Sequence, residues 1–470
     1  MIQGPVTGGR HGWAFARPLF DLAERGYVEE EFFLSGEATT YTQAPGTDWG
    51  RDGKWTVNPS GKVPFRTRML VYRPADSRKF NGTVVTCWNN VTAGYELFFG
   101  ESPEVLESGC AFVCASVQKA GVHGFDDNPQ GLIAWDRERY GDLDIPTDDA
   151  SYDIFTQIGR AVGPNRDRTN DPLGGLEVSS VIGIGASQSA GRLATYVNAI
   201  HPFSSGQGGR TFDGYILQIY FGAGAGIEAS DRPTPVDRTA PRAVPRAANL
   251  IREDLDVPAM IVNTELEAIS CYGVRQPDTA KFVTWEAAAL THVSYQAQVI
   301  RNRKYERDFG VAPPAASQQM NRIYIQPYYD AALHHMRGWV KGGTPAPAQP
   351  LIEFTSAGEV IRDEHGIARG GIRLPQAAVP VAMNSSVPVS RDFPGMLRGS
   401  NKVFGAAKLR SLYGDEVNYL RLFEAAAARA VERGVMLPRD VAPAIEEAAS
   451  EYRRAGRMVG LPELSADGAR

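Results

Sequence analysis

Ser187 is the residue whose type and surroundings point most directly to chemistry. It lies in the stretch GASQSAG at 185–191, after the apolar run VIGI at 181–184 and before a segment with helical periodicity. This order of strand, sharp turn and helix is the setting of a nucleophile elbow, in which a serine is held ready to attack a carbonyl carbon. Small residues must flank the serine. Gly185 meets this need, although Ser189 stands where the usual pattern has glycine.

The same glycines allow two other interpretations. Gly183 and Gly185 after a strand could open a dinucleotide-binding loop, but Gln188 stands where that loop needs its third glycine. The acidic residue that should end a second strand about 20 residues later is also missing. A turn without any chemical role is the other alternative. We favour the elbow, because the strand, the small residues and the helix all support it.

A serine becomes an effective nucleophile only when a base takes its proton and an acid orients that base. After an elbow of this kind the acid and then the histidine follow in chain order. Glu265 and Glu267 follow the apolar run at 257–262, and His292 follows the last predicted strand. We therefore predict the triad Ser187, Glu267 and His292. Glu265 remains the alternative acid.

The other histidines and the acidic stretches do not form a metal-binding pattern. His334 and His335 lie in a predicted amphipathic helix without the HExxH spacing. The acidic stretch at 142–149 lacks the pattern of a calcium loop. We expect neither a metal nor another cofactor. His123 follows the apolar run at 111–117, so it could face the site as a substrate-pocket residue.

The predicted reaction needs donors for the negative charge that develops on the carbonyl oxygen. The backbone N–H of Gln188, next to the serine, is the first expected donor, and the loop CWNNVTAG at 87–94 should supply the second. We favour Asn90 in that loop, with Asn89 as the alternative, although both could merely shape the turn. Aromatic residues near strand ends could line an apolar pocket or belong to the core; they are Trp88, Tyr220 and Phe221.

Short, fully apolar runs with turn signals after each are spread along the chain, with helical segments between most of them. Such runs are typical of strands buried on both faces, so the alternation predicts a doubly wound α/β sheet. The stretch at 63–73 differs because apolar and polar residues alternate in it. It predicts a half-exposed strand with Arg66 and Arg68 on its outer face.

Two stretches do not fit a bare sheet. Residues 222–256 are rich in Pro, Arg and Ala and lie between two predicted strands. An insertion of that length commonly covers something, so we expect it, with part of segment 300–345, to form a cap over the site. A Pro-rich link after residue 343 leads to a predicted strand pair in GGIRLPQAAVPVAM and then to helices. We expect residues 343–470 to pack on the core of a single domain, 1–470.

The composition limits the kinds of protein this chain can be. Its 470 residues are 43% hydrophobic and 22% charged, with a net charge of −5 and no basic patch of the kind that nucleic acids require. No stretch approaches about 18 apolar residues, so no membrane span is predicted. The start has no secretory pattern, and four scattered cysteines predict no disulfide framework. The cytoplasm is the expected compartment, and the oligomeric state is not predicted.

Over nearly its whole length the sequence resembles the bacterial alpha/beta hydrolase domain family, a group of serine hydrolases. The resemblance implies the α/β-hydrolase fold and the same three residues, Ser187, Glu267 and His292. Two positions depart from the family's pattern: Cys87 stands where an acidic residue is usual, and Glu267 where aspartate is frequent. The matching pieces are GPVTGGRHG, GYVEEEFFLSGEATTY, FNGTVVTCWNNVTAG, WDRERYGDLDIPTDDASYDIFTQ, GASQSAGRLATYVNAIHP, VNTELEA, WEAAALTHVS and HGIARGGIRLPQAAVPVA.

These observations predict a cofactor-independent serine hydrolase that acts on a small-molecule ester or lactone. The expected α/β-hydrolase fold has a mostly parallel central sheet flanked by helices, a cap built from insertions and a C-terminal helical extension. An acyltransferase, which passes the acyl group to an alcohol, would use the same triad. A hydrolase fold used only for binding is the second alternative. We expect no nucleic-acid or membrane partner.

Overall fold

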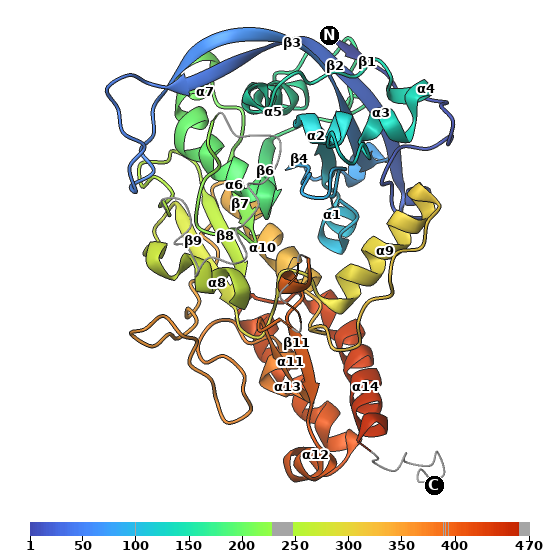
Figure 1. The fold of residues 1–470 in the computed structure, drawn as a ribbon, viewed down its shortest axis with the longest axis vertical. Helices are drawn as coiled ribbons and strands as arrows, with labels where there is room; N and C mark the ends of the chain where they lie inside the picture. The colour runs from blue at the N-terminus through green and yellow to red at the C-terminus, as the bar shows by residue number, and fades with distance from the viewer. Residues whose placement is uncertain (99, 228–247, 389, 391, 393, 460–470) are drawn as a thin grey trace.

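A nine-stranded sheet lies at the centre of the computed structural model, which describes residues 1–98, 100–227, 248–388, 390, 392 and 394–459. Within these residues the strands lie side by side in the order β1-β2-β3-β5-β4-β6-β7-β8-β9 (Figure 1). Their bounds are β1 (Ile2–Gln3), β2 (Tyr27–Gln43), β3 (Val57–Pro74), β4 (Thr83–Trp88), β5 (Ala111–Ala115), β6 (Ser180–Ala186), β7 (Gly214–Gln218), β8 (Ala259–Thr264) and β9 (Phe282–Ala287).

The sheet has an antiparallel part and a parallel part. Strands β1, β2 and β3 pair antiparallel in that order, and β3 pairs antiparallel with β5. From β5 through β4 and β6 to β9, all neighbours are parallel. Strands β4 and β5 are buried along their whole length, as expected where both faces of a parallel sheet are covered. The predicted mostly parallel α/β sheet is confirmed.

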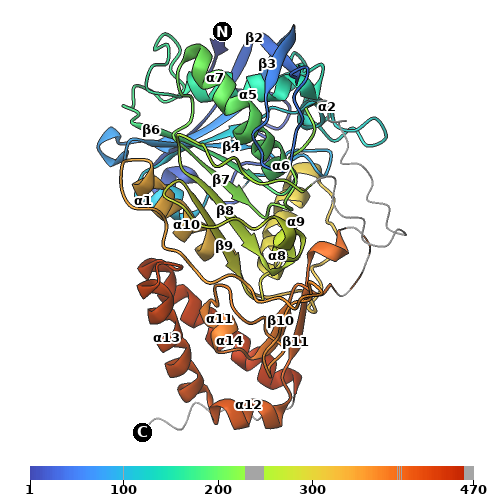
Figure 2. The ribbon, with the colours of Figure 1, turned by 90° about the vertical axis from the view of Figure 1, so that its left-hand side faces the viewer.

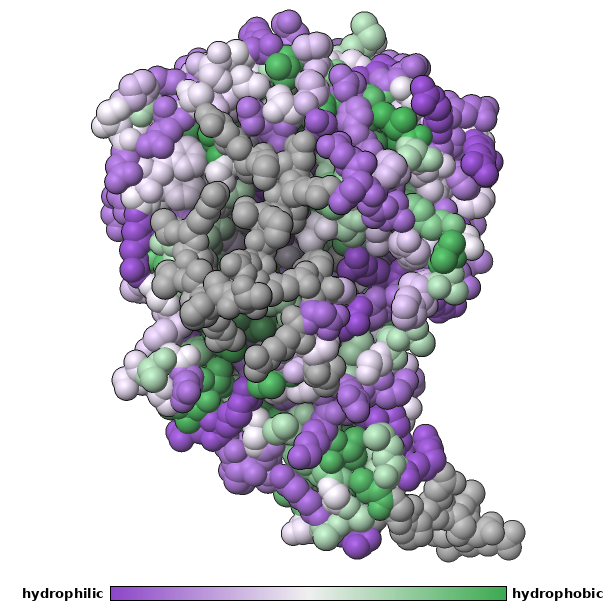
Figure 3. Space-filling model, in the orientation of Figure 1, coloured by the Kyte–Doolittle hydropathy of each residue, from purple (hydrophilic) through white to green (hydrophobic). Residues whose placement is uncertain are grey.

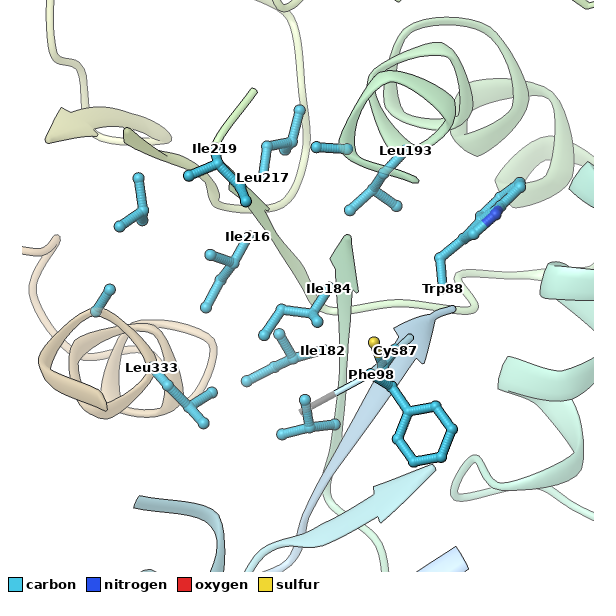
Figure 4. Close-up of a cluster of buried hydrophobic side chains, with 14 of the residues drawn as sticks. Cys87, Trp88, Phe98, Ile182, Ile184, Leu193, Ile216, Leu217, Ile219 and Leu333 are labelled. Atoms are coloured by element: carbon cyan, nitrogen blue, oxygen red, sulfur yellow. The ribbon is translucent and has the colours of Figure 1, made fainter. Parts of the chain in front are cut away.

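Helices cover both faces of the parallel strands (Figure 2). Helix α6 packs on β6 and α10 contacts β7, and Figure 4 shows Leu193 of α6 and Leu333 of α10 on opposite sides of these strands. Within the described ranges, no helix combines the length and the apolar character needed to cross a membrane. The helix bounds are α1 (Pro103–Ser108), α2 (Lys119–His123), α3 (Leu132–Trp135), α4 (Arg137–Tyr140), α5 (Ser151–Ala161), α6 (Gln188–Thr195), α7 (His201–Gly208), α8 (Glu265–Cys271), α9 (Tyr295–Phe309), α10 (Gln326–Trp339), α11 (Pro375–Ala378), α12 (Ala406–Tyr413), α13 (Glu416–Glu432) and α14 (Val441–Met458).

The C-terminal helices form a lobe beside the sheet, together with a short hairpin (Figures 1 and 2). In this hairpin β10 (Ala382–Ser385) pairs antiparallel with β11 (Ser400–Val403). The strand pair predicted within GGIRLPQAAVPVAM is therefore wrong in position. Helix α11, with a proline in its first turn, occupies the middle of that stretch, and the partner of β10 comes later in the chain. Hydrophobic residues gather in a patch on the visible face of this lobe (Figure 3).

From Arg68 onward the outer face of β3 is buried, whereas the sequence predicts that it is exposed. Arg68 is fully buried on that face, because other parts of the chain cover it. Its guanidinium lies 3.2 Å from Glu31 Oε1 and 2.6 Å from Glu96 Oε2. Nη1 also donates a hydrogen bond of 3.2 Å to the carbonyl of Phe15 in the N-terminal segment. The prediction for Arg68 is wrong because the local alternation of residues contains no information about the distant segments that cover this side chain. Those segments supply the carboxylates and the carbonyl that pair with its guanidinium.

Replacing Arg68 by methionine should lower the free energy of unfolding by about 3–5 kcal/mol, because Glu96 would remain as a buried charge without its ion-pair partner. Urea denaturation at neutral pH measures this change. Arg66→Met is the matched control: Arg66 is half-buried and bonds the neutral side chains of Ser35 and Gln3, so its loss should cost less than about 1 kcal/mol. Equal losses for the two variants would contradict this account of the buried charges.

Candidate active site

Ser187 occupies the sharp turn between β6 and α6, at the carboxyl ends of the parallel strands. Its backbone has φ 59° and ψ −118°, a conformation that residues other than glycine rarely adopt. The Ser187 N–H donates a hydrogen bond of 3.0 Å to the carbonyl of Gln218 on the neighbouring strand β7, which helps to hold the turn. This strained backbone is the geometry by which an elbow lifts its serine above the sheet.

The residues two positions before and after Ser187 show which part of the usual pattern this turn keeps and how it accommodates the departure. The hydroxyl of Ser189 accepts a hydrogen bond of 2.9 Å from the Ala186 N–H and donates one of 3.0 Å to the Ala186 carbonyl. A Cβ on Gly185 would lie 2.7 Å from the carbonyl oxygen of Ser189, so this position requires glycine. The serine in the second small position therefore fits because it bonds the backbone of the turn from within.

Glu267 and His292 are brought together at the end of the sheet. His292 Nδ1 lies 2.7 Å from Glu267 Oε1, and both side chains are buried. Glu267 also closes the first turn of α8 as part of a capping box with Thr264. Its Oε2 accepts a hydrogen bond of 3.1 Å from the Thr264 N–H and another from the Thr264 hydroxyl. The two oxygens of one carboxylate thus hold the imidazole and the start of the helix.

Glu265, the alternative acid, has other partners. Its Oε1 lies 2.7 Å from Arg362 Nη2 and accepts a hydrogen bond of 2.8 Å from the Ser386 hydroxyl. Its Oε2 accepts one of 2.9 Å from the Ala289 N–H. Glu265 therefore fastens the loop after β9 to C-terminal segments, while Glu267 is the acid that contacts His292.

Ser187 and His292 both line one cavity of about 330 Å³. This volume is at the lower end of the range of small-molecule sites. Its walls come from the ends of β4 and β6, from helices α1, α9 and α10, and from the segment that includes Pro394 and Leu397. Apolar side chains make up much of this lining: Phe98, Val105, Ile184, Ile219, Ile300 and Leu333.

The residues predicted for a substrate pocket do not all reach this cavity. Trp88 lines it. Phe221 lies outside the lining but stacks on the imidazole of His292, with ring centroids 5.3 Å apart. Tyr220 is buried away from the cavity, and His123 Nε2 pairs with Asp144 Oδ1 at 3.0 Å. Among the described residues, the lining therefore does not include the predicted Tyr220 and His123.

The two expected oxyanion donors differ in their availability. Gln188 is the first residue of α6, so its backbone N–H has no acceptor within the helix. The N–H of Asn90 donates to the Leu97 carbonyl at 3.0 Å, and that of Asn89 to the Ala115 carbonyl at 3.2 Å. Neither backbone group is left for an oxyanion, contrary to the expectation from the sequence. Asn90 nevertheless lines the cavity, and its side-chain Nδ2 donates a hydrogen bond of 2.9 Å to the carbonyl of Ala186, the residue before Ser187.

Cys87 lines the cavity at the position where an acidic residue was expected from the resemblance. Burial raises the pKa of its thiol to about 12, with a further contribution from the charge of Glu96. The thiol is therefore neutral near pH 7 and adds a small apolar surface. Among the described residues, no group of three or more potential metal ligands gathers in one place.

Helices α9 and α10 supply cavity residues that the sequence analysis did not single out. Helix α10 and most of α9 lie in segment 300–345, where part of a cap is expected from the sequence. Most of the other expected cap segment, residues 228–247 of 222–256, lies outside the described residues. No local motif marks the new residues, because only the packing of the two helices decides which of their faces meets the serine. The residues are Arg301, Gln326, Tyr329, Asp330 and Leu333, together with Tyr324 just before α10.

The model of the alpha/beta hydrolase domain family matches residues 2–446 of the chain. The chain belongs to this family. No curated protein matches this alpha/beta hydrolase. Solved structures with a similar fold include brefeldin A esterase, described as a bacterial homologue of human hormone-sensitive lipase, at 13% identity and a TM-score of 0.30 over 59% of this chain and 73% of that one.

Two further esterases are similar to this alpha/beta hydrolase. The esterase Est22 shares 15% identity at a TM-score of 0.30, over 68% of this chain and 81% of that one. A hyperthermophilic esterase from the archaeon Pyrobaculum calidifontis shares 12% identity at a TM-score of 0.27, over 53% and 83%. These likenesses concern the fold, whereas the site of this alpha/beta hydrolase is described by its own residues.

If Glu267 is the triad acid that the sequence predicts, Glu267→Gln should lower kcat by about 10⁴-fold, because a neutral amide would no longer stabilise the positive charge expected on His292. Glu265→Gln is the matched comparison. It should lower the free energy of unfolding by about 1–3 kcal/mol through the lost pairing with Arg362, with a much smaller effect on kcat per folded molecule. Ester hydrolysis and urea denaturation of both variants measure these effects. The reverse order of the kcat losses would make Glu265 the acid.

Asp330 should give the stability a measurable pH dependence. Burial raises its pKa to about 7 from 3.8 and nearby Asp440 adds to this, although Gln326 and Arg439 act in the opposite direction. Between about pH 4 and pH 7 the folded protein keeps a proton on Asp330 that the unfolded chain has released. Ionisation then favours the unfolded chain, so the free energy of unfolding falls as the pH rises through this window. Relative to Asp330→Asn, the unfolding free energy of the wild type should fall by about 2–4 kcal/mol over that window.

Urea denaturation at several pH values tests this expectation. Asp126→Asn, at an exposed position, is the control that should leave the pH profile unchanged. Parallel profiles for the wild type and Asp330→Asn would show that Asp330 is not the responsible group.

Proposed function

We propose that this alpha/beta hydrolase cleaves a carboxylic ester or lactone through an acyl-enzyme on Ser187. One observation supports this most strongly: the serine, on a strained elbow, shares a cavity with His292, whose Nδ1 bonds the buried carboxylate of Glu267. A turn with only a structural role does not require a histidine–carboxylate pair at the same cavity. The three residue types in this order are those of serine hydrolysis.

Acylation would begin when Ser187 Oγ attacks the carbonyl carbon of the ester and passes its proton to His292 Nε2. The bond between Glu267 and Nδ1–H fixes the tautomer in which Nε2 can accept that proton. The tetrahedral intermediate then collapses, and the bond from the carbonyl carbon to the alcohol oxygen breaks. His292 gives its proton to that oxygen, so the alcohol leaves neutral.

Deacylation would reverse these roles with water in place of the alcohol. His292 takes a proton from the water molecule as its oxygen adds to the acyl carbon. The second tetrahedral intermediate collapses, the bond to Ser187 breaks, and the proton returns to Oγ. The free acid leaves, and the enzyme regains its starting state without any cofactor.

The oxyanion of each intermediate needs donors close to Ser187. We assign the first to the backbone N–H of Gln188. For the second we now propose the Asn90 carboxamide in place of a backbone group: one of its two N–H bonds is used on the Ala186 carbonyl, and the other is available. A donor of this kind typically contributes about 2.7–4 kcal/mol to transition-state stabilisation.

The apolar walls of the cavity would bind the hydrocarbon part of the substrate. We further propose that α9 and α10 set the choice of substrate, because they line the cavity of the serine without taking part in its chemistry, and that the insertion at 222–256 acts with them as a cap. The single unit 1–470 would then combine a catalytic sheet with a wall that selects the substrate, and residues 343–470 would contribute to that wall through Leu397.

Ser187→Ala should abolish ester hydrolysis, with a loss of roughly 10⁴–10⁶-fold, and leave the urea denaturation profile unchanged. A fluorophosphonate probe should label the wild type at Ser187 and fail to label this variant, as intact-protein and peptide mass spectrometry would show. Ser189→Ala is the matched control, since it removes a hydroxyl two residues away that bonds only the turn. Labelling at Ser189, or retention of more than about a tenth of the activity by Ser187→Ala, would overturn the assignment.

A further inference from the structure

Arg301 on α9 lies on the wall of the cavity that Ser187 and His292 share. Its side chain is half-buried, and it makes a long hydrogen bond of 3.4 Å from Nη2 to the hydroxyl of Tyr95. Among the described residues, no carboxylate forms an ion pair with it. A guanidinium carries five N–H donors, so the described residues use little of the hydrogen-bonding capacity of Arg301.

Three other cations of similar burial, two of them on the same helix, have carboxylate partners. On the same helix, Arg307 Nε lies 2.7 Å from Asp308 Oδ1, and Lys304 pairs with Glu101. Arg322, just before α10, lies 2.7 Å from Glu451. The cavity wall therefore holds a positive charge that the described part of the protein leaves without an ion-pair partner.

The cavity also holds two unpaired hydroxyls that can donate hydrogen bonds to a ligand. The hydroxyls of Tyr329 and Thr92 are buried and have no hydrogen-bond partner in the described structure. Burial also raises the pKa of the Tyr329 phenol, so its proton stays in place. The Asp330 carboxyl is already engaged, since Oδ1 accepts from Gln326 Nε2 at 2.8 Å and Oδ2 from the Glu104 N–H at 3.3 Å.

A cavity with these properties fits a ligand rich in acceptor oxygens and with a negative charge. Apolar walls lower the effective dielectric and strengthen the attraction between a guanidinium and an anion. A carboxylate matches the guanidinium best, because its two oxygens can accept two parallel hydrogen bonds from one arginine. A neutral ester would fill the apolar part of the cavity and leave the charge of Arg301 without a partner.

We propose that the substrate is an ester or lactone that carries a carboxylate, and that Arg301 binds this carboxylate while Ser187 attacks the ester carbonyl. This inference rests on the proposed ester hydrolysis at Ser187. Arg301 would then select the substrate without taking part in bond making. Its removal should impair acidic esters and spare neutral ones, a pattern that a merely structural arginine would not produce.

The test compares matched acidic and neutral esters by kcat/KM. Monoethyl adipate against ethyl hexanoate places the carboxylate on the acyl side, and the acetate ester of lactate against isopropyl acetate places it on the alcohol side. The wild type should prefer the acidic member of at least one pair. Arg301→Gln should lose roughly 10–100-fold on that member and less than about threefold on its neutral partner, in keeping with the strength of a charged hydrogen-bonded pair.

Arg303→Gln is the matched control, because it removes the same charge from an exposed position on the same helix. It should leave both rates unchanged if the effect requires contact with the substrate rather than a long-range attraction. The preference of the wild type should also shrink as salt is added, since the ion pair is partly screened.

Equal losses on acidic and neutral esters in Arg301→Gln, or no acidic preference of the wild type in either pair, would overturn the inference. Labelling of Ser187 by a fluorophosphonate probe separates the two levels of the proposal. Labelling with hydrolysis of neutral esters, but without a selective effect of Arg301, would overturn the carboxylate inference and leave the proposed function standing. Absence of both labelling and hydrolysis would overturn the two together.

Discussion

The candidate site depends on the carboxylate of Glu267, which forms two kinds of bond at once. One oxygen completes the capping box that begins α8, and the other lies 2.7 Å from the imidazole of His292. A capping box needs Glu or Gln at the third helical position, so the acid of the proposed triad is fixed by the same rule that starts the helix. The orientation of the imidazole is thereby tied to the end of β8. The side chain of glutamate at this position has the reach that both bonds require.

The loop that carries His292 is fastened from several sides as well. Glu265 joins it to Arg362 and Ser386, and the Thr291 hydroxyl donates to the Leu397 carbonyl at 3.1 Å. These partners come from the C-terminal part of the chain, which therefore contributes to the geometry of a site whose proposed chemical groups all lie before it. A preorganised site of this kind spends little free energy on ordering its groups during the reaction.

The parts of the fold that the sequence predicts are those with a local cause. Buried parallel strands give continuous apolar runs, and the elbow at Ser187 needs small neighbours, so both leave a pattern that can be read. Arg68 is a position at which the local pattern predicts the wrong exposure. Its alternation with apolar residues indicates an exposed face, but the covering N-terminal segment and Glu96 come from elsewhere in the chain. The strand pair near residue 380 was misplaced for a similar reason, since β10 finds its partner beyond the predicted stretch.

The candidate site likewise contains residues that a local pattern predicts and residues that only the folded structure identifies. Ser187, Glu267 and His292 follow strand ends, and the order of strands in a sheet brings such positions to one edge. Their catalytic roles stay predictions. The backbone groups of Asn89 and Asn90 could not be judged from the sequence, because their acceptors at Ala115 and Leu97 belong to the folded loop. Arg301 and Tyr329 carry no motif, and only the packing of α9 and α10 turns them toward the serine.

The position of Leu397 in the cavity wall affects the order in which the site is synthesised and assembled during translation. All three residues of the proposed triad have been synthesised once the chain reaches His292, but Pro394 and Leu397 follow about a hundred residues later. The Val293 N–H donates to the Leu397 carbonyl at 3.0 Å, so the loop beside the histidine is completed by a late segment. A nascent chain that holds the full set of reactive groups therefore still lacks part of the chamber around them. Synthesis and assembly of the site are separated in time, and a chain released early is left with its reactive groups but without a complete place to bind a substrate.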